Sequence, residues 1–101
     1  MSTEVHIFLA VGWATAATRY PVGEPHAMNI YVRQRTGTDH DWPAAEVVAM
    51  LGGWSEIEFR NAGIVTGEGL EEPLLSCYRS AVEDGHALLV YDEPVRAATP
   101  G

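Results

Sequence analysis

The sequence predicts an α+β fold, a two-layer α/β sandwich in which a mixed sheet of four or five strands carries two helices on one face. Strand-like segments alternate with two segments that place an apolar residue every three or four positions. Two helices are too few to cover both faces of a sheet evenly. At 101 residues the chain has the size of one domain, which we expect at 1–93, followed by a flexible tail at 94–101.

The first two strands are predicted at Val5–Trp13 and Met28–Arg35. The first is apolar on both faces, which is typical of a strand that is covered on both sides. It follows Glu4 instead of the basic residues of a secretory signal, so we interpret it as a strand. The second strand alternates apolar and polar residues. The connection at 14–27 is long enough to fold over part of the sheet or over a ligand.

The first helix is predicted to begin after Asp41, whose side chain is able to cap free amides, with Pro43 in the first turn. The apolar stripe that we expect to face the sheet consists of Ala44, Val47, Val48 and Leu51. Two successive glycines, Gly52 and Gly53, predict the end of this helix.

A third strand is predicted at Trp54–Arg60. Residues 61–63 leave two alternatives open: a tight turn before a short returning strand at 64–66, or one bent strand with a bulge at Gly63. A second helix is expected over 70–83 and a last strand at His86–Tyr91.

The charge balance excludes several kinds of catalytic and cofactor site. Fourteen carboxylates and six arginines give a net charge of −8, and there is no lysine. Schiff-base catalysis, a pyridoxal phosphate anchor and a P-loop all need a lysine amine and are therefore excluded. An acidic chain is also a poor direct ligand for nucleic acid. We expect no cofactor, because no motif for one is present.

The location is predicted from cysteine usage and hydropathy. Cys77 is the single cysteine, and its place on the apolar stripe of the second helix predicts a core residue. One cysteine makes no internal disulfide, so we expect a cytoplasmic protein. No apolar segment reaches the roughly 18 residues needed to span a bilayer, so no membrane association is expected.

The leading functional prediction is a non-catalytic acidic protein that binds and inhibits a partner with a basic, nucleic-acid-binding surface. Carboxylates have the sign of phosphates, so such a protein acts as a nucleic-acid mimic, as immunity or anti-CRISPR type inhibitors do. Glu83 and Asp84 end the second helix, where negative charge is unfavourable, which favours selection for surface charge. The predicted partner-binding residues are Glu68, Glu71, Glu72, Glu83 and Asp84.

The alternative is a small homodimeric enzyme or small-molecule-binding domain with its site between the sheet and the 14–27 loop. Histidines titrate near neutral pH and suit acid–base roles, but none has an evident orienting carboxylate beside it in sequence. The densest group, residues 39–41, lacks further ligands at metal-site spacing, so no metal is expected. The candidate residues for this alternative are His6, His26, Tyr31, Asp39, His40 and Asp41.

Overall fold

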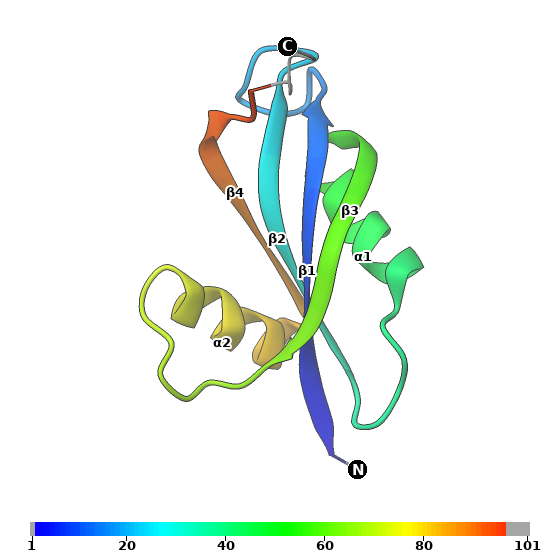
Figure 1. Cartoon of the computed structure of the whole chain (residues 1–101), viewed down its shortest axis with the longest axis vertical. Coiled ribbons are helices and arrows are strands. Elements are labelled where there is room, and N and C mark those ends of the chain that lie inside the picture. The colour runs from blue at the N-terminus through cyan, green and yellow to red at the C-terminus, as the bar shows by residue number, and fades with distance from the viewer. Residues whose placement is uncertain (1, 97–101) are drawn as a thin grey trace.

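The computed structural model describes residues 2–96 and confirms the α+β class and the predicted order β-β-α-β-α-β (Figure 1). The elements are β1 (Thr3–Ala14), β2 (Pro25–Arg35), α1 (Trp42–Leu51), β3 (Trp54–Val65), α2 (Leu74–Asp84) and β4 (His86–Pro94). Of the tail predicted at 94–101, residues 97–101 lie outside the described part. Pro94 ends β4, and the Val95 amide donates to the Pro25 carbonyl at 2.8 Å.

The four strands form one sheet in the order β3-β1-β2-β4, and every neighbouring pair is antiparallel. The prediction of a mixed sheet is therefore wrong. The helical crossover through α1 does join two strands that run in the same direction, β2 and β3. They are not neighbours, however, because β1 lies between them and pairs with both.

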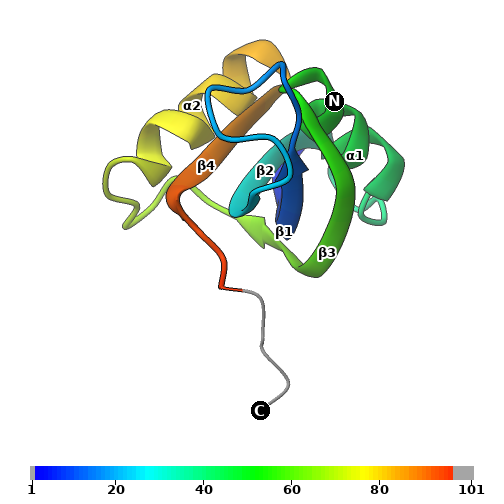
Figure 2. The same ribbon diagram turned by 90° about the horizontal axis from the view of Figure 1, so that it is seen from above.

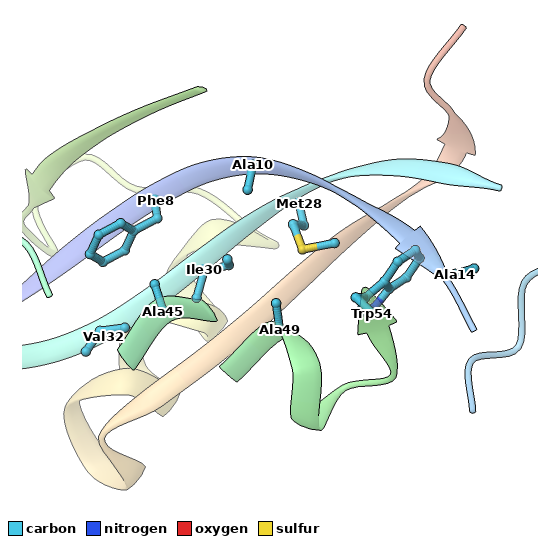
Figure 3. Close-up of a cluster of buried hydrophobic side chains, with 9 residues drawn as sticks. All are labelled: Phe8, Ala10, Ala14, Met28, Ile30, Val32, Ala45, Ala49 and Trp54. Atoms are coloured by element: carbon cyan, nitrogen blue, oxygen red, sulfur yellow. The ribbon is translucent and has the colours of Figure 1, made fainter. Parts of the chain in front are cut away.

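The two helices lie on opposite faces of the sheet, so the prediction that both share one face is also wrong. Successive residues of a strand point to opposite faces. The face that carries Phe8 and Ile30 packs against Ala45 and Ala49 of α1 (Figure 3). The other face carries Val5 and Tyr31, which pack against α2 through its residues Leu74, Cys77, Tyr78 and Ala81. The central strands carry buried side chains on both faces, and each face therefore needs its own cover.

Helix α1 begins as predicted and turns a different side to the sheet. The Asp41 carboxylate accepts a hydrogen bond from the Ala44 amide at 3.1 Å, which confirms the cap. Ala45 and Ala49 are fully buried, whereas Val47 and Leu51, expected in the core, are 52% and 80% exposed. Ala44 and Val48, the other two residues of the predicted stripe, are half-buried and pack against the same core. In the described residues no helix combines the length and apolar character needed to cross a membrane.

Helix α2 and strand β3 also differ from their predicted bounds. Helix α2 begins at Leu74, four residues later than expected, after the cap position held by Pro73. Strand β3 is one continuous strand, in which Gly63 pairs in register with Ile7. The irregularities fall instead at Arg60 and near Glu56, which has a φ of 51°.

The loop between β1 and β2 closes over one end of the sheet, with α1 and α2 on either side of it in the view of Figure 2. It is tied to the turn that joins α1 to β3, because the Thr15 hydroxyl donates to the Gly53 carbonyl at 2.6 Å. Gly53 has a φ of +96°, and a Cβ there would lie 2.9 Å from Thr18 Cγ2 and 3.1 Å from Ala17 Cβ. The close contact and the backbone conformation both require glycine.

We predict that Gly53→Ala destabilises the protein more than Gly23→Ala. Gly23 has a φ of +85°, but nothing lies within 4 Å of an added Cβ. The control should lose about 1–2 kcal/mol for its left-handed backbone. Gly53→Ala should lose a further 1–3 kcal/mol, roughly, from overpacking against the loop. Urea denaturation measures both, and equal losses would contradict the tight loop contact.

Candidate functional site

The five predicted partner-binding carboxylates lie on α2 and on the loop that leads into it, and all are exposed. We call this set the acidic surface of α2: Glu68, Glu71, Glu72, Glu83 and Asp84. Within residues 2–96 the arginine ion pairs are Arg19–Asp92 and Arg60–Glu58, so none of the five is neutralised by an arginine. Ser76 donates a hydrogen bond to Glu72.

The arginines near α2 do not neutralise the carboxylates of the acidic surface of α2. Residues 68–84 contain the five carboxylates and one arginine, Arg79, which forms no ion pair in the described chain. Arg33 reaches α2 from β2, but its guanidinium donates to the Val82 carbonyl at 2.6 Å. That bond satisfies a free carbonyl of the last helical turn. The acidic surface of α2 therefore carries a strong local excess of negative charge.

The six residues of the alternative ligand site do not come together. His6 and His40 meet on the α1 face of the sheet, whereas His26 pairs with the opposite end of β1, at Gly12. Tyr31 is buried on the other face, beneath α2. Asp39 is exposed, and Asp41 caps α1. A single site built from all six is therefore wrong.

A hydrogen-bonded chain runs from Glu4 through His6 to His40. His6 is 1% exposed, and its Nε2 lies 2.9 Å from the Glu4 carboxylate. Its Nδ1 lies 2.7 Å from Nδ1 of His40. An ionised carboxylate only accepts, so Nε2 of a neutral His6 carries the proton, and its Nδ1 accepts from Nδ1–H of His40. This assignment leaves the lone pair of His40 on Nε2, as in a base oriented by a carboxylate.

The same geometry argues against a metal between the two histidines. Two imidazole nitrogens on one tetrahedral zinc ion, with bonds of about 2.0–2.1 Å, lie roughly 3.3 Å apart. The 2.7 Å separation fits a hydrogen bond instead. No group of three or more histidine, cysteine or carboxylate side chains suited to a metal ion occurs among residues 2–96.

His26 forms a second buried pair. Its Nδ1 lies 2.7 Å from the Tyr91 carbonyl and its Nε2 lies 2.7 Å from the Glu24 carboxylate. The carbonyl only accepts, so Nδ1 carries a proton, and a further proton must lie between Nε2 and Glu24. Tyr20 stacks on His26 with ring centroids 4.1 Å apart, and its hydroxyl donates to Asp92 at 2.6 Å. The pair thus joins the loop to β4.

Sequence analysis missed the carboxylate partners of both buried histidines. Each follows a glutamate by two positions, in Glu4-Val5-His6 and Glu24-Pro25-His26. Residues two apart on a strand share a face, so a glutamate at that spacing is able to reach the imidazole. The expectation that no histidine has an orienting carboxylate beside it is therefore wrong, and the repeated Glu-x-His spacing is the signal that would have found both.

A hollow of about 420 Å³ lies between the sheet and the 14–27 loop, where the alternative function placed its ligand. It is lined by Ala17, Thr18, Arg19, Tyr20, Gly52, Trp54, Leu88 and Val90. No histidine contributes to this lining. The hollow and the Glu4–His6–His40 chain are therefore separate features.

No family model, curated protein or solved structure matches this chain.

We predict that Glu4→Gln flattens the acid dependence of stability. Hydrogen bonds from His6 and from the Gly37 amide lower the pKa of the Glu4 carboxyl. A lowered pKa stabilises the fold above the pKa of the unfolded chain, and this stabilisation is lost as the pH falls through the folded-state pKa. Urea denaturation between about pH 6 and pH 3 should therefore show a smaller loss for Glu4→Gln than for the unmodified protein.

Glu46→Gln is the matched control, because Glu46 is exposed on α1 and forms no ion pair in the described chain. It should follow the unmodified protein across the range. If Glu4→Gln and Glu46→Gln behaved alike, the Glu4–His6 contact would contribute nothing to acid sensitivity.

Proposed function

We propose that this chain is a non-catalytic interaction domain that binds and inhibits a protein with a basic, nucleic-acid-binding surface. The observation that carries the proposal is the acidic surface of α2, whose five exposed carboxylates have no arginine partner in the described chain. Carboxylates without an internal partner keep their charge for an approaching molecule. A basic surface that binds phosphates also attracts these carboxylates.

The packing of α2 supports this role, because it holds Glu83 and Asp84 on a rigid element and fixes the end of the loop that carries Glu68, Glu71 and Glu72. Tyr31 and Ala81 are fully buried between α2 and the sheet. The helix has 11 residues and spans about 16 Å, with carboxylates before its first turn and at its end. A fixed spacing of charges reduces the ordering cost of binding. Such a face would compete with nucleic acid for the partner, as immunity and anti-CRISPR type inhibitors do.

A cytoplasmic location is part of the same proposal. Cys77, the single cysteine, is half-buried where α2 packs against the sheet. This burial raises the pKa of its thiol. A protonated thiol is a weak nucleophile, so the cysteine is suited to packing instead of redox chemistry.

The second candidate function, a small-molecule-binding or enzymatic domain, is favoured by the Glu4–His6–His40 chain alone. A base oriented through a buried carboxylate–imidazole pair is a catalytic arrangement as well as a structural one. The aromatic rings that contact His40 are those of His6, Phe8 and Trp42, which supply no nucleophile. We therefore rank this candidate below the interaction domain.

We predict that a triple variant, Glu68→Gln, Glu71→Gln and Glu72→Gln, loses partner binding. The protein would be immobilised and used to capture partners from native lysate at about 0.05 M and 0.5 M salt. A stoichiometric basic partner should bind at low salt and be released at high salt, because exposed charges are screened over about 10 Å at 0.1 M. With the purified partner, the triple variant should bind at least about tenfold more weakly.

The matched control removes the same number of charges elsewhere, through Asp39→Asn, Glu46→Gln and Glu56→Gln, all exposed and outside the acidic surface of α2. Equal weakening by both triple variants would show that net charge matters and the α2 surface does not. A partner whose affinity is the same at both salt concentrations would overturn the electrostatic proposal. A protein that captures nothing and sediments as a dimer would favour the ligand-binding candidate.

A further inference from the structure

Among residues 2–96, strand β4 forms a free edge of the sheet, because β2 is its one neighbour in the strand order. The Arg33 amide donates to the Gly85 carbonyl at 2.9 Å. Hydrogen-bonded and non-hydrogen-bonded pairs alternate along an antiparallel ladder. In the same register, Ala87 and Leu89 therefore bond to β2, and the backbone groups of His86, Leu88 and Val90 point away from the sheet. Three residues thus offer amides and carbonyls to a further strand.

The two edges of the sheet differ in how they are protected. Proteins block exposed edges with charges, bulges and proline. Strand β3, at the other edge, has two irregularities and the charged residues Glu56, Glu58 and Arg60. Residues 86–91 of β4, with the sequence HALLVY, contain no carboxylate, arginine or proline. Residues 86–91 of the β4 edge therefore lack the features that protect β3, which β4 carries only beyond Tyr91, in Asp92, Glu93, Pro94 and a register irregularity.

A hollow of about 480 Å³ lies across this unprotected edge. It is lined by Val48 and Leu51 of α1 and the following Gly52, by Ser76, Cys77 and Ser80 of α2, and by His86, Ala87 and Leu88 of β4. The two helices lie on opposite faces of the sheet, so a hollow that touches both must pass over the edge between them. The α1 side offers apolar contacts, and the α2 side offers small and polar ones.

The charges at the two ends of the β4 edge determine which kind of polypeptide segment is complementary to it. Glu83 and Asp84 precede it and Asp92 and Glu93 follow it. A second copy of the chain, paired antiparallel about Leu88, would place Asp84 opposite Asp92 of that copy. Like charges directly opposite one another are destabilising. Of these four carboxylates, Asp92 forms an ion pair with Arg19 at 2.8 Å. The other three, Glu83, Asp84 and Glu93, have no arginine partner in the described chain. A strand with basic residues at both ends is complementary to this arrangement.

We propose that the β4 edge binds an extended segment of a partner protein as a fifth, antiparallel strand. The segment alternates apolar side chains, which contact Val48, Leu51 and Leu88, with small side chains, which face α2. Arginines flank it at both ends. This inference rests on the proposed function, since the segment belongs to the same basic partner, and it adds main-chain pairing as the means of recognition.

The test uses the intact protein and a synthetic peptide with the sequence RRLSLSLRR, acetylated and amidated at its ends. In antiparallel pairing the residue opposite Leu88 lies on the α1 face, so the leucines face α1 and their amides point at β4. Isothermal titration calorimetry should give a Kd of about 100 µM or lower. Methylation of the three leucine amides should weaken binding at least about tenfold, because it removes the donors to β4. Methylation of the two serine amides, which point away, should leave the Kd within about threefold.

Protein variants give a second, independent measurement. Leu51→Asn removes an apolar contact from the hollow and should weaken peptide binding several-fold. Val22→Asn is the matched control, because Val22 is 72% exposed and Leu51 is 80% exposed, and only Leu51 lines the hollow. Both variants should fold, and circular dichroism would verify this before titration.

The outcomes separate this inference from the proposed function. Peptide binding that weakens with salt but ignores both methylation patterns would overturn strand addition and leave the acidic attraction standing. No binding of any peptide at about 0.05 M salt would overturn strand addition, whereas the proposed function would still be decided by the partner capture with the two triple variants. Sedimentation velocity supplies the remaining check. A dimer that Leu51→Asn dissociates would show that a second copy occupies the edge, and would overturn the proposal.

Discussion

The central strands β1 and β2 carry buried side chains on both faces, and this constraint accounts for much of the molecule. Phe8 and Ile30 are fully buried on one face and Tyr31 on the other. Each such side chain stabilises the fold by about 1.5–3 kcal/mol when it is removed from water. Neither face is therefore left open, and the chain assigns one helix to each. The helices have 10 and 11 residues, or about 15–16 Å, whereas β1 has 12 residues and spans roughly 40 Å.

Each helix consequently covers only part of its face, and the remainder is filled in different ways. On the α1 face the β1–β2 loop packs Tyr20 near His26 and Trp54. On the α2 face a hollow of about 510 Å³ remains, lined in part by Val11, Trp13 and Ala27. The free edge of β4 lies between the two incomplete layers. The surface features used in the proposals are thus consequences of covering two apolar faces with two short helices.

The buried histidines follow from a second constraint. A polar side chain inside the protein is costly unless it is hydrogen-bonded. His6 and His26 are 1% and 0% exposed, and each is paired with a glutamate two residues earlier on the same face. Every buried side-chain nitrogen and oxygen in the described part of the chain has a partner. The two Glu-x-His pairs therefore let imidazoles pack among aromatic rings near the two ends of β1, and they explain how a strand so rich in apolar residues also contains His6.

Local patterns in the sequence were sufficient for the element types and their order, and for the Asp41 cap. The arrangement of elements was not, because it depends on contacts between distant residues. The sequence of α1 is apolar nearly all round, so its pattern did not indicate that alanines, and not Val47 and Leu51, would meet the sheet. The hydrogen bond between His6 and His40 joins residues that are 34 positions apart, so no local pattern in the sequence indicated it. The Glu-x-His spacing did have a local signal, in strand periodicity, but the predicted strands began at Val5 and Met28 and so left out Glu4 and Glu24.

The acidic surface of α2 and the β4 edge are adjacent, since Glu83 and Asp84 stand just before His86 in sequence. Exposed charges add little affinity individually, about 0–1 kcal/mol each, but they act at long range and speed the encounter. Main-chain pairing acts only at contact, and by itself it accepts almost any extended segment. In the proposed complex the charge attraction and the main-chain pairing are therefore complementary. The carboxylates at both ends of the edge repel a second copy of this acidic chain and attract a basic one, so the charge supplies the selectivity that backbone hydrogen bonds lack. The same carboxylates let residues 86–91 remain without a charged residue, a bulge or a proline, because the charge that recruits the partner also limits self-association.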